Sequence, residues 1–131
     1  MDSKEKNKKI MIVDDDKFLL EMYAKKFSNA GFEVLSAISA EDSLNQLRNS
    51  NDIDVFLFDI IMPEMDGLEL LQKVKSENLS PKSLNIVLSN QGQKVEVEKA
   101  QELGVDGYIV KALHTPSEVL VKVNQILDNR K

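Results

Sequence analysis

Short apolar runs alternate along this chain with segments whose apolar residues recur every three or four positions, and this alternation limits the possible folds. The apolar runs have the length of β-strands and span 9–14, 33–37, 54–59, 84–89 and 107–110. The segments with helical spacing are 16–30, 40–49, 66–77, 93–103 and the stretch that begins at Thr115. Strands that alternate with helices form a parallel sheet through right-handed crossovers, with helices on both faces. The sequence therefore predicts a doubly wound α/β fold.

Turn and capping residues mark where the predicted helices begin and end. Gly31 has the place of a C′ glycine after the first helix. Ser39 precedes the second helix and is followed three residues later by Asp42, which is a capping-box-like start. Thr115 and Pro116 have the chemistry of an N-cap and a first helical residue. The polar set Glu96, Glu98, Lys99 and Glu102 reads as a solvated face of the fourth helix.

Carboxylates stand where two of the apolar runs end. Asp14 and Asp15 follow the first run, and Asp59 ends the third and leads into a turn that contains Pro63 and Gly67. The carboxyl ends of parallel strands share one edge of the sheet, where ligands bind in such folds. Burying a carboxylate is costly unless a cation meets it. If the first and third strands are neighbours, these residues form a cation site, and Asp16 remains as the N-cap of the first helix.

Composition excludes several classes of function. The length of 131 residues, with 42% apolar and 30% charged residues, predicts one globular domain. The net charge of −5 disfavours direct binding to nucleic acid or to an anionic membrane. The absence of cysteine excludes thiolate metal sites and thiol nucleophiles. No apolar run has the length of a membrane span, and the lysine-rich start lacks a signal-peptide core. We expect a cytoplasmic protein with a disordered lead-in over residues 1–8.

The motifs at the strand ends resemble those of the receiver domain of bacterial two-component response regulators. The acidic pair in IVDDD, the run from Asp59 to Gly67, Ser89 in IVLSN and Lys111 in GYIVK occur in the family's order. The resemblance extends from about Lys9 to Leu127 and implies a single receiver domain over 9–129. It also implies the flavodoxin-like strand order 2-1-3-4-5 with five flanking helices.

The resemblance further implies a role for each residue of the acidic cluster. Asp59 would accept a phosphoryl group from a histidine kinase or a phosphotransfer protein. Asp15, Asp59 and the backbone carbonyl of Ile61 would hold Mg²⁺, and Asp14 would act mostly through a metal-bound water. The residue types suit this role because Mg²⁺ prefers oxygen ligands, commonly one or two carboxylates and a phosphate.

The same resemblance assigns the switch and the output surface. Ser89 and Lys111 would contact phosphoryl oxygens, and Tyr108 would be a rotameric switch. The predicted fourth helix, fifth strand and last helix would form the face that binds a downstream protein, as a monomer or as an activation-dependent dimer. Because the chain ends near the predicted last helix, we expect output through protein contact, unless the chain is a fragment of a longer regulator.

Two positions depart from the family pattern. Most receivers have a cis proline after the lysine, and this chain has Ala112, so the turn is either all-trans or strained. A small residue usually follows the position of Ser89, whereas this chain has Asn90. We expect Asn90→Ala to change the lifetime of the acyl phosphate.

Simpler interpretations and other functions remain open at this point. Lys111 is also compatible with a solvated turn lysine, Ser89 with a local backbone cap, and Tyr108 with half-buried packing. His114 reads as a solvated loop residue. A pseudo-receiver that binds proteins without phosphotransfer is the main alternative function. A small aspartyl phosphatase and a flavin-binding protein are disfavoured, since the Asp-x-Asp-x-Thr motif and a phosphate-binding loop are absent.

Overall fold

A computed structural model of the chain describes residues 8–49, 52–90 and 94–130. Residues 1–7 of the predicted lead-in lie outside the described residues. The strands are β1 (Lys9–Val13), β2 (Glu33–Ala37), β3 (Val55–Phe58), β4 (Leu84–Ser89) and β5 (Gly107–Val110). The helices are α1 (Lys17–Asn29), α2 (Ala40–Asn49), α3 (Gly67–Ser76), α4 (Lys94–Glu102) and α5 (Pro116–Asn129). A short 3₁₀ turn, η2 (Lys111–Leu113), joins β5 to α5.

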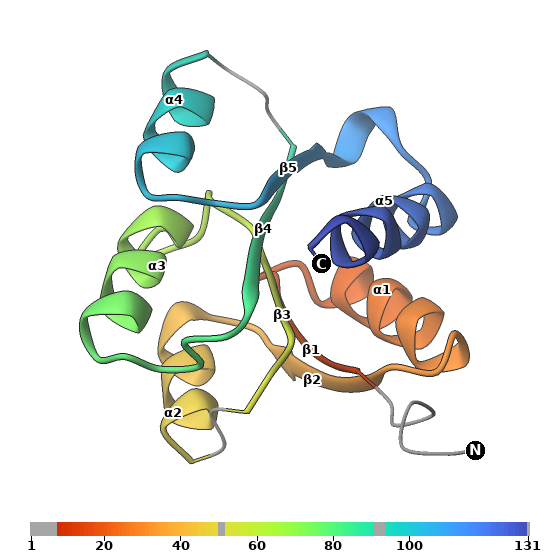
Figure 1. The fold of residues 1–131 in the computed structure, drawn as a ribbon, viewed down its shortest axis with the longest axis horizontal. Helices are drawn as coiled ribbons and strands as arrows, with labels where there is room; N and C mark the ends of the chain where they lie inside the picture. The colour runs from red at the N-terminus through yellow and green to blue at the C-terminus, as the bar shows by residue number, and fades with distance from the viewer. Residues whose placement is uncertain (1–7, 50–51, 91–93, 131) are drawn as a thin grey trace.

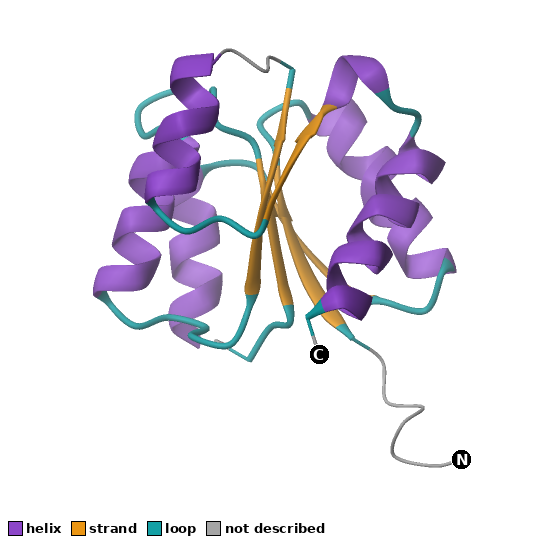
Figure 2. Cartoon of the chain, turned by 45° about the horizontal axis from the view of Figure 1, so that its top comes forward, coloured by secondary structure: helices purple, strands orange, loops and turns teal. Residues whose placement is uncertain are grey.

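The five strands form one parallel sheet in the order β2-β1-β3-β4-β5, which confirms the predicted fold class. Helices α1 and α5 cover one face of the sheet, and α2, α3 and α4 cover the other (Figures 1 and 2). Strand β1 lies between β2 and β3, with Val13 opposite Phe58. The strand order therefore reverses beside β1, and the carboxyl ends of β1 and β3 are neighbours.

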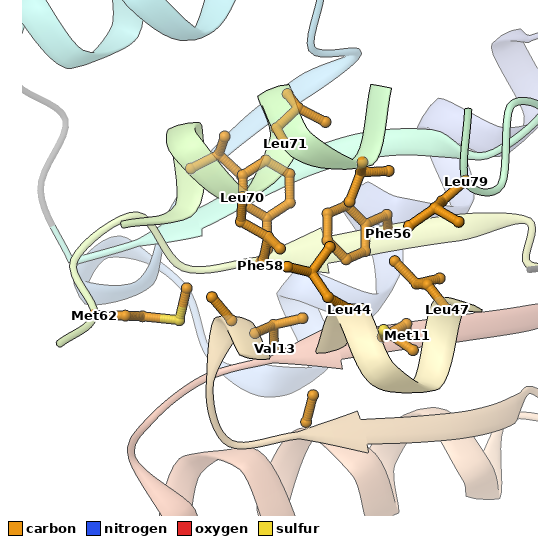
Figure 3. Packing of buried hydrophobic residues seen from close by; sticks show 14 of the residues in the cluster. Met11, Val13, Leu44, Leu47, Phe56, Phe58, Met62, Leu70, Leu71 and Leu79 are labelled. Carbon is orange, nitrogen blue, oxygen red and sulfur yellow. The ribbon is translucent and has the colours of Figure 1, made fainter. Parts of the chain in front are cut away.

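The sheet is buried on both faces because successive strand residues point into different cores. In β1, Met11 and Val13 join the core under α2 and α3, whereas Ile10 and Ile12 join the core under α1 and α5. Figure 3 shows the first of these cores, in which the β3 side chains face leucines of α2 and α3. This two-sided burial explains why Ile10–Val13 of β1 and all of β3 are continuous apolar runs, whereas the edge strand β2 carries exposed Glu33 and Ser36.

Capping side chains set the starts of the helices that flank the carboxyl edge. The Asp16 side chain accepts a hydrogen bond from the Leu19 N–H, as expected for the N-cap of α1. Thr115 and Glu118 form a full capping box at α5. A second capping box joins Asp66 and Glu69 at α3, which the sequence analysis did not predict.

None of the helices in the described ranges has the length and apolar character needed to span a bilayer.

Candidate functional site

Three strands bring Asp14, Asp59 and Lys111 together at the carboxyl edge of the sheet. Asp14 follows β1, Asp59 follows β3, and the Asp59 N–H donates to the Val13 carbonyl at 3.0 Å. Lys111 follows β5, and its Nζ donates to Asp14 Oδ2 at 2.6 Å and to Asp59 Oδ2 at 2.9 Å. The lysine side chain is buried, so its interpretation as a solvated turn residue is wrong.

Backbone N–H groups orient the two buried carboxylates. Asp14 Oδ1 accepts from the Asp16 N–H at 3.0 Å, and Asp59 Oδ1 accepts from the Ile61 N–H at 3.3 Å. Asp14 is 1% exposed and Asp59 is 6% exposed, whereas Asp15 is exposed. Each buried carboxylate thus has one oxygen bound to the backbone and the other bound to Lys111.

The carboxylates of Asp14, Asp15 and Asp59 offer ligand atoms that all lie within 4.8 Å of one another. A cluster of hard oxygen donors at this spacing fits a divalent cation such as Mg²⁺. The exposed Asp15 opens the cluster to solvent, which provides a route for an incoming ion. The ligand role of the Ile61 carbonyl stays a prediction, since the structure shows only the bond of its N–H.

Burial and charge act in opposite directions on the ionisation of this site. Burial raises the pKa of Asp59, and the hydrogen bond and charge of Lys111 only partly offset it. For Lys111, burial alone would lower the pKa, but hydrogen bonds to Asp14 and Asp59 outweigh it and raise the pKa above its usual value. The lysine therefore stays cationic at neutral pH, and the buried carboxylates depend on it.

The structure also brings the two predicted switch residues into contact. Ser89 ends β4 and is fully buried, and Tyr108 in β5 packs partly buried against the core under α2 and α3. Burial and the charge of Glu96 raise the pKa of Tyr108, while a side-chain hydrogen bond with Ser89 lowers it. Tyr108 is thus a packing residue whose phenol also reaches the serine. Their switching role remains a prediction.

The turn after Lys111 is all-trans. The described residues contain no cis peptide bond, and Lys111–Leu113 form a 3₁₀ turn closed by a hydrogen bond from the His114 N–H to the Lys111 carbonyl. The turn begins with the lysine itself, so Lys111 reaches the carboxylates without the family's cis proline. Asn90 is exposed directly after Ser89, and His114 is partly buried after the turn, with its Nδ1 3.9 Å from Glu118 Oε1.

Gly67 supports the site in a way that sequence reasoning missed. A Cβ atom at Gly67 would lie 2.0 Å from the Asp59 carbonyl oxygen, so the start of α3 touches the backbone of the candidate phosphoacceptor. The Gly67 N–H also donates to the Ile60 carbonyl at 2.7 Å. The sequence indicated only a turn at this position. The contact between Gly67 and Asp59 depends on the path of the loop between them, which spacing of eight positions does not reveal.

The chain forms an open parallel sheet with an acidic, lysine-containing site at its carboxyl edge. The comparison with known proteins agrees with this description. The family model described as "Response regulator receiver domain" matches residues 10–124. The chain therefore belongs to the response regulator receiver domain family.

Relatives and solved structures of this family cover nearly the whole chain. The response regulator SaeR of Staphylococcus aureus (strain USA300) is 30% identical over 93% of this chain and 51% of its own length. A CheY-like receiver domain protein from Methanospirillum hungatei JF-1 is 32% identical, with a TM-score of 0.84 over 94% of this chain and 95% of its own. The BeF3-activated DrrB receiver domain is 29% identical, with a TM-score of 0.79 over 93% and 98%. The chain spans about half the length of the curated relatives it matches.

Family membership fixes the general class of function. Receiver domains are signalling domains of two-component systems that interact with histidine kinases and downstream effectors, and they are not enzymes in the usual sense. This classification removes the phosphatase and flavin alternatives. The pseudo-receiver alternative concerns phosphorylation itself and is taken up below.

Proposed function

We propose that this chain is a phosphorylatable receiver in which Asp59 accepts a phosphoryl group from a histidine kinase or a histidine phosphotransfer protein. The observation that carries the proposal is the position of Asp59, which bonds to Lys111 and lies within 4.8 Å of carboxylate oxygens of Asp14 and Asp15. A nucleophile, a fixed cation and candidate metal ligands are therefore close together. Positioning and charge neutralisation are the main requirements of phosphoryl transfer.

The reaction forms one bond and breaks another. A carboxylate oxygen of Asp59 attacks the phosphorus of a phosphohistidine, the P–N bond breaks, and its electron pair returns to the imidazole. The product is an acyl phosphate on Asp59. Mg²⁺, held by Asp14, Asp15, Asp59 and the Ile61 carbonyl, would neutralise charge on the phosphoryl oxygens.

Lys111 supplies the second positive charge, from the position that its side chain already has beside Asp59. Its Nζ already contacts Asp59 Oδ2, and it is held there by Asp14. As the phosphoryl group arrives, the ammonium exchanges its bond to Asp59 for a bond to a phosphoryl oxygen. Ser89 donates its hydroxyl to another of these oxygens.

The signal leaves the site through Tyr108. Its phenol bonds to the Ser89 side chain, so movement of Ser89 toward the phosphoryl group changes the position of the ring. The face formed by α4, β5 and α5 then changes shape and binds a downstream protein or a second copy of the chain. Phosphorylation shifts a population between two existing forms. We infer that the contacts with the kinase and with the downstream protein take place in the cytoplasm.

The test is intact-protein mass after incubation with acetyl phosphate and Mg²⁺. We expect one phosphoryl adduct that is absent in Asp59→Asn and absent in EDTA. The matched control is Asp128→Asn, which removes an exposed carboxylate at the end of α5 and should leave the adduct intact.

A pseudo-receiver is the second candidate, favoured by Asn90 and Ala112, which depart from the family pattern on either side of the site. That candidate predicts no adduct and no spectral response to beryllofluoride with Mg²⁺. Such a pair of results would overturn the phosphoacceptor proposal. An adduct that persists in Asp59→Asn would place the acceptor elsewhere.

A further inference from the structure

Strand β2 lies at one edge of the sheet, where its outer backbone groups face away from β1 (Figure 1). The Asp14 N–H donates to the Ala37 carbonyl at 3.1 Å, so this carbonyl points toward β1. Because the backbone groups of successive strand residues point to opposite sides, the Ser36 carbonyl and the Ile38 N–H point outward. Outward groups of this kind are a template on which another strand can add.

Two side chains of α2 bond to these outward groups. Gln46 Nε2 donates to the Ser36 carbonyl at 2.8 Å. Asp42 Oδ2 accepts from the Ile38 N–H at 3.3 Å. The two side chains also hold each other, since Gln46 Nε2 donates to Asp42 Oδ1 at 3.2 Å. They lie four residues apart and therefore share one face of α2.

This arrangement reproduces the hydrogen bonds of one residue in an added strand. A residue of a parallel sixth strand would donate its N–H to the Ser36 carbonyl and accept from the Ile38 N–H. Gln46 supplies the donor and Asp42 supplies the acceptor at these two positions. An antiparallel strand would also need both groups. The two side chains therefore compete with a strand of either direction.

Helix capping alone does not explain the position of Asp42. Its N–H donates to Ser39 Oγ at 3.0 Å, which is the first half of a capping box. In a full box the acidic side chain returns to the N–H of the N-cap residue, as Glu69 does with Asp66 at α3. The Asp42 side chain instead bonds to the N–H of Ile38, one residue earlier, where β2 ends. It satisfies the strand edge.

We propose that Asp42 and Gln46 form a plug that occupies the hydrogen-bonding positions of a sixth strand and prevents β2 from pairing with β2 of a second copy of the chain. Strand β2 has five residues, so the plug blocks a large part of its outer edge. Association between copies is then restricted to other surfaces, such as the face of α4, β5 and α5. The plug does not depend on phosphorylation of Asp59.

The experiment compares self-association of Gln46→Ala and Asn45→Ala by sedimentation equilibrium. Asn45 is the control because it is an exposed amide residue of α2 next to Gln46. We expect Gln46→Ala to raise the association constant about tenfold, the effect of freeing one hydrogen-bonding group on each of two edges. Asn45→Ala should change it less than about twofold. Alanine is a stronger helix former than glutamine, so α2 should remain folded, and chemical denaturation checks this.

The acceptor of the plug is tested in the same way with Asp42→Ala. We expect a higher association constant and faster hydrogen exchange of the Ile38 amide in the monomer, because its acceptor is lost. Glu41→Ala is the control, since it removes the same charge from an exposed position in the first turn of α2. It should leave both quantities unchanged.

Hydrogen exchange also identifies the surface through which the copies associate. The Ser36 amide should become protected when Gln46→Ala associates, because its N–H points to the open edge. Adding Ser36→Lys to Gln46→Ala places a charge on this edge and should restore the association constant of the unmodified chain. Equal association constants in Gln46→Ala and Asn45→Ala would overturn the proposal. Tighter association that leaves the Ser36 amide unprotected would also overturn it, since another surface would be responsible.

Discussion

Gly67 is the residue with the least freedom to change at the site. Its missing side chain allows α3 to start against the Asp59 carbonyl, and a Cβ atom there would lie 2.0 Å from that oxygen. The nearest atoms belong to backbone, so no side-chain rotation can relieve the clash. The residue therefore fixes the path of the loop that carries Asp59 and Ile61.

We expect Gly67→Ala to lower the free energy of unfolding by about 3 kcal/mol or more, because backbone must move to admit the methyl group. The control is Gly31→Ala, since Gly31 has φ +99° and open space around its Cβ position. That change should cost about 1 kcal/mol, from conformation alone. Chemical denaturation of both variants measures the difference. Equal losses would show that the loop shifts at little cost.

Residue chemistry was only partly predictable from sequence. It was possible to place Asp14, Asp59 and Lys111 at strand ends. The motifs that contain them resemble those of a known family. The bond that joins Lys111 to both carboxylates could not be predicted, because spacing along the chain gives no side-chain direction. Of the predicted solvated face of α4, Glu98, Lys99 and Glu102 are exposed, and only the partial burial of Glu96 was missed, for a related reason. A charged residue on a helix reads as solvated until the neighbouring helix that partly covers it is known.

At the scale of the elements, α4 differs from the other helices in how little it buries. Ala100 is its only fully buried residue among those described, whereas α3 buries Gly67, Leu70, Leu71 and Val74. The two helices have nearly the same length, so the difference reflects packing. An element with few buried apolar contacts opens at a lower free energy than the whole domain. Helix α4 is therefore the element best suited to change position.

We expect the backbone amides of α4 to exchange with solvent deuterium faster than those of α3 under native conditions. Native-state hydrogen exchange followed by NMR measures both helices in one sample. The comparison uses amides beyond the first turn of each helix, whose N–H groups have intrahelical partners. Equal protection in the two helices would contradict the expectation and would assign α4 to the cooperative core.

The helices and strands themselves were predictable because periodicity and capping signals agreed. Thr115, Pro116 and Glu118 specify the start of α5 in the sequence, and the structure shows the same capping box. The strand order was not available from periodicity, since the runs do not reveal which strands are neighbours. It came from the resemblance at the strand ends. The capping box at α3 was missed because Asp66 lies inside a motif read for its chemistry, and Glu69 follows just beyond it.

At the scale of the molecule, stability depends on a single internal cation at the carboxyl edge. Lys111 joins the ends of β1, β3 and β5 through its two ionic partners, Asp14 and Asp59, and all three residues are buried. Removing one member of a buried ionic group leaves the others uncompensated, at a cost of about 3–5 kcal/mol. A divalent ion bound to the same carboxylates can replace part of that loss.

We expect Lys111→Met to lower the melting temperature in EDTA and to gain more from added Mg²⁺ than the unmodified chain does. Binding to the folded form alone stabilises it in proportion to the logarithm of metal concentration. Lys82→Met, which removes an exposed lysine, is the control and should respond to Mg²⁺ as the unmodified chain does. Scanning calorimetry of the three proteins provides the measurement. The same Mg²⁺ response in all three proteins would show that the metal does not bind to the carboxylates that Lys111 contacts.

The contact between Lys111 and Asp14 joins positions 97 residues apart in the chain. During synthesis on the ribosome, Asp14 and Asp59 emerge long before the lysine that completes their surroundings. A nascent chain can therefore display its acidic residues while β5 is still inside the exit tunnel, without the geometry that the proposed phosphoryl transfer requires. An unfinished chain that ends before β5 therefore lacks the Lys111 contacts that join Asp14 and Asp59.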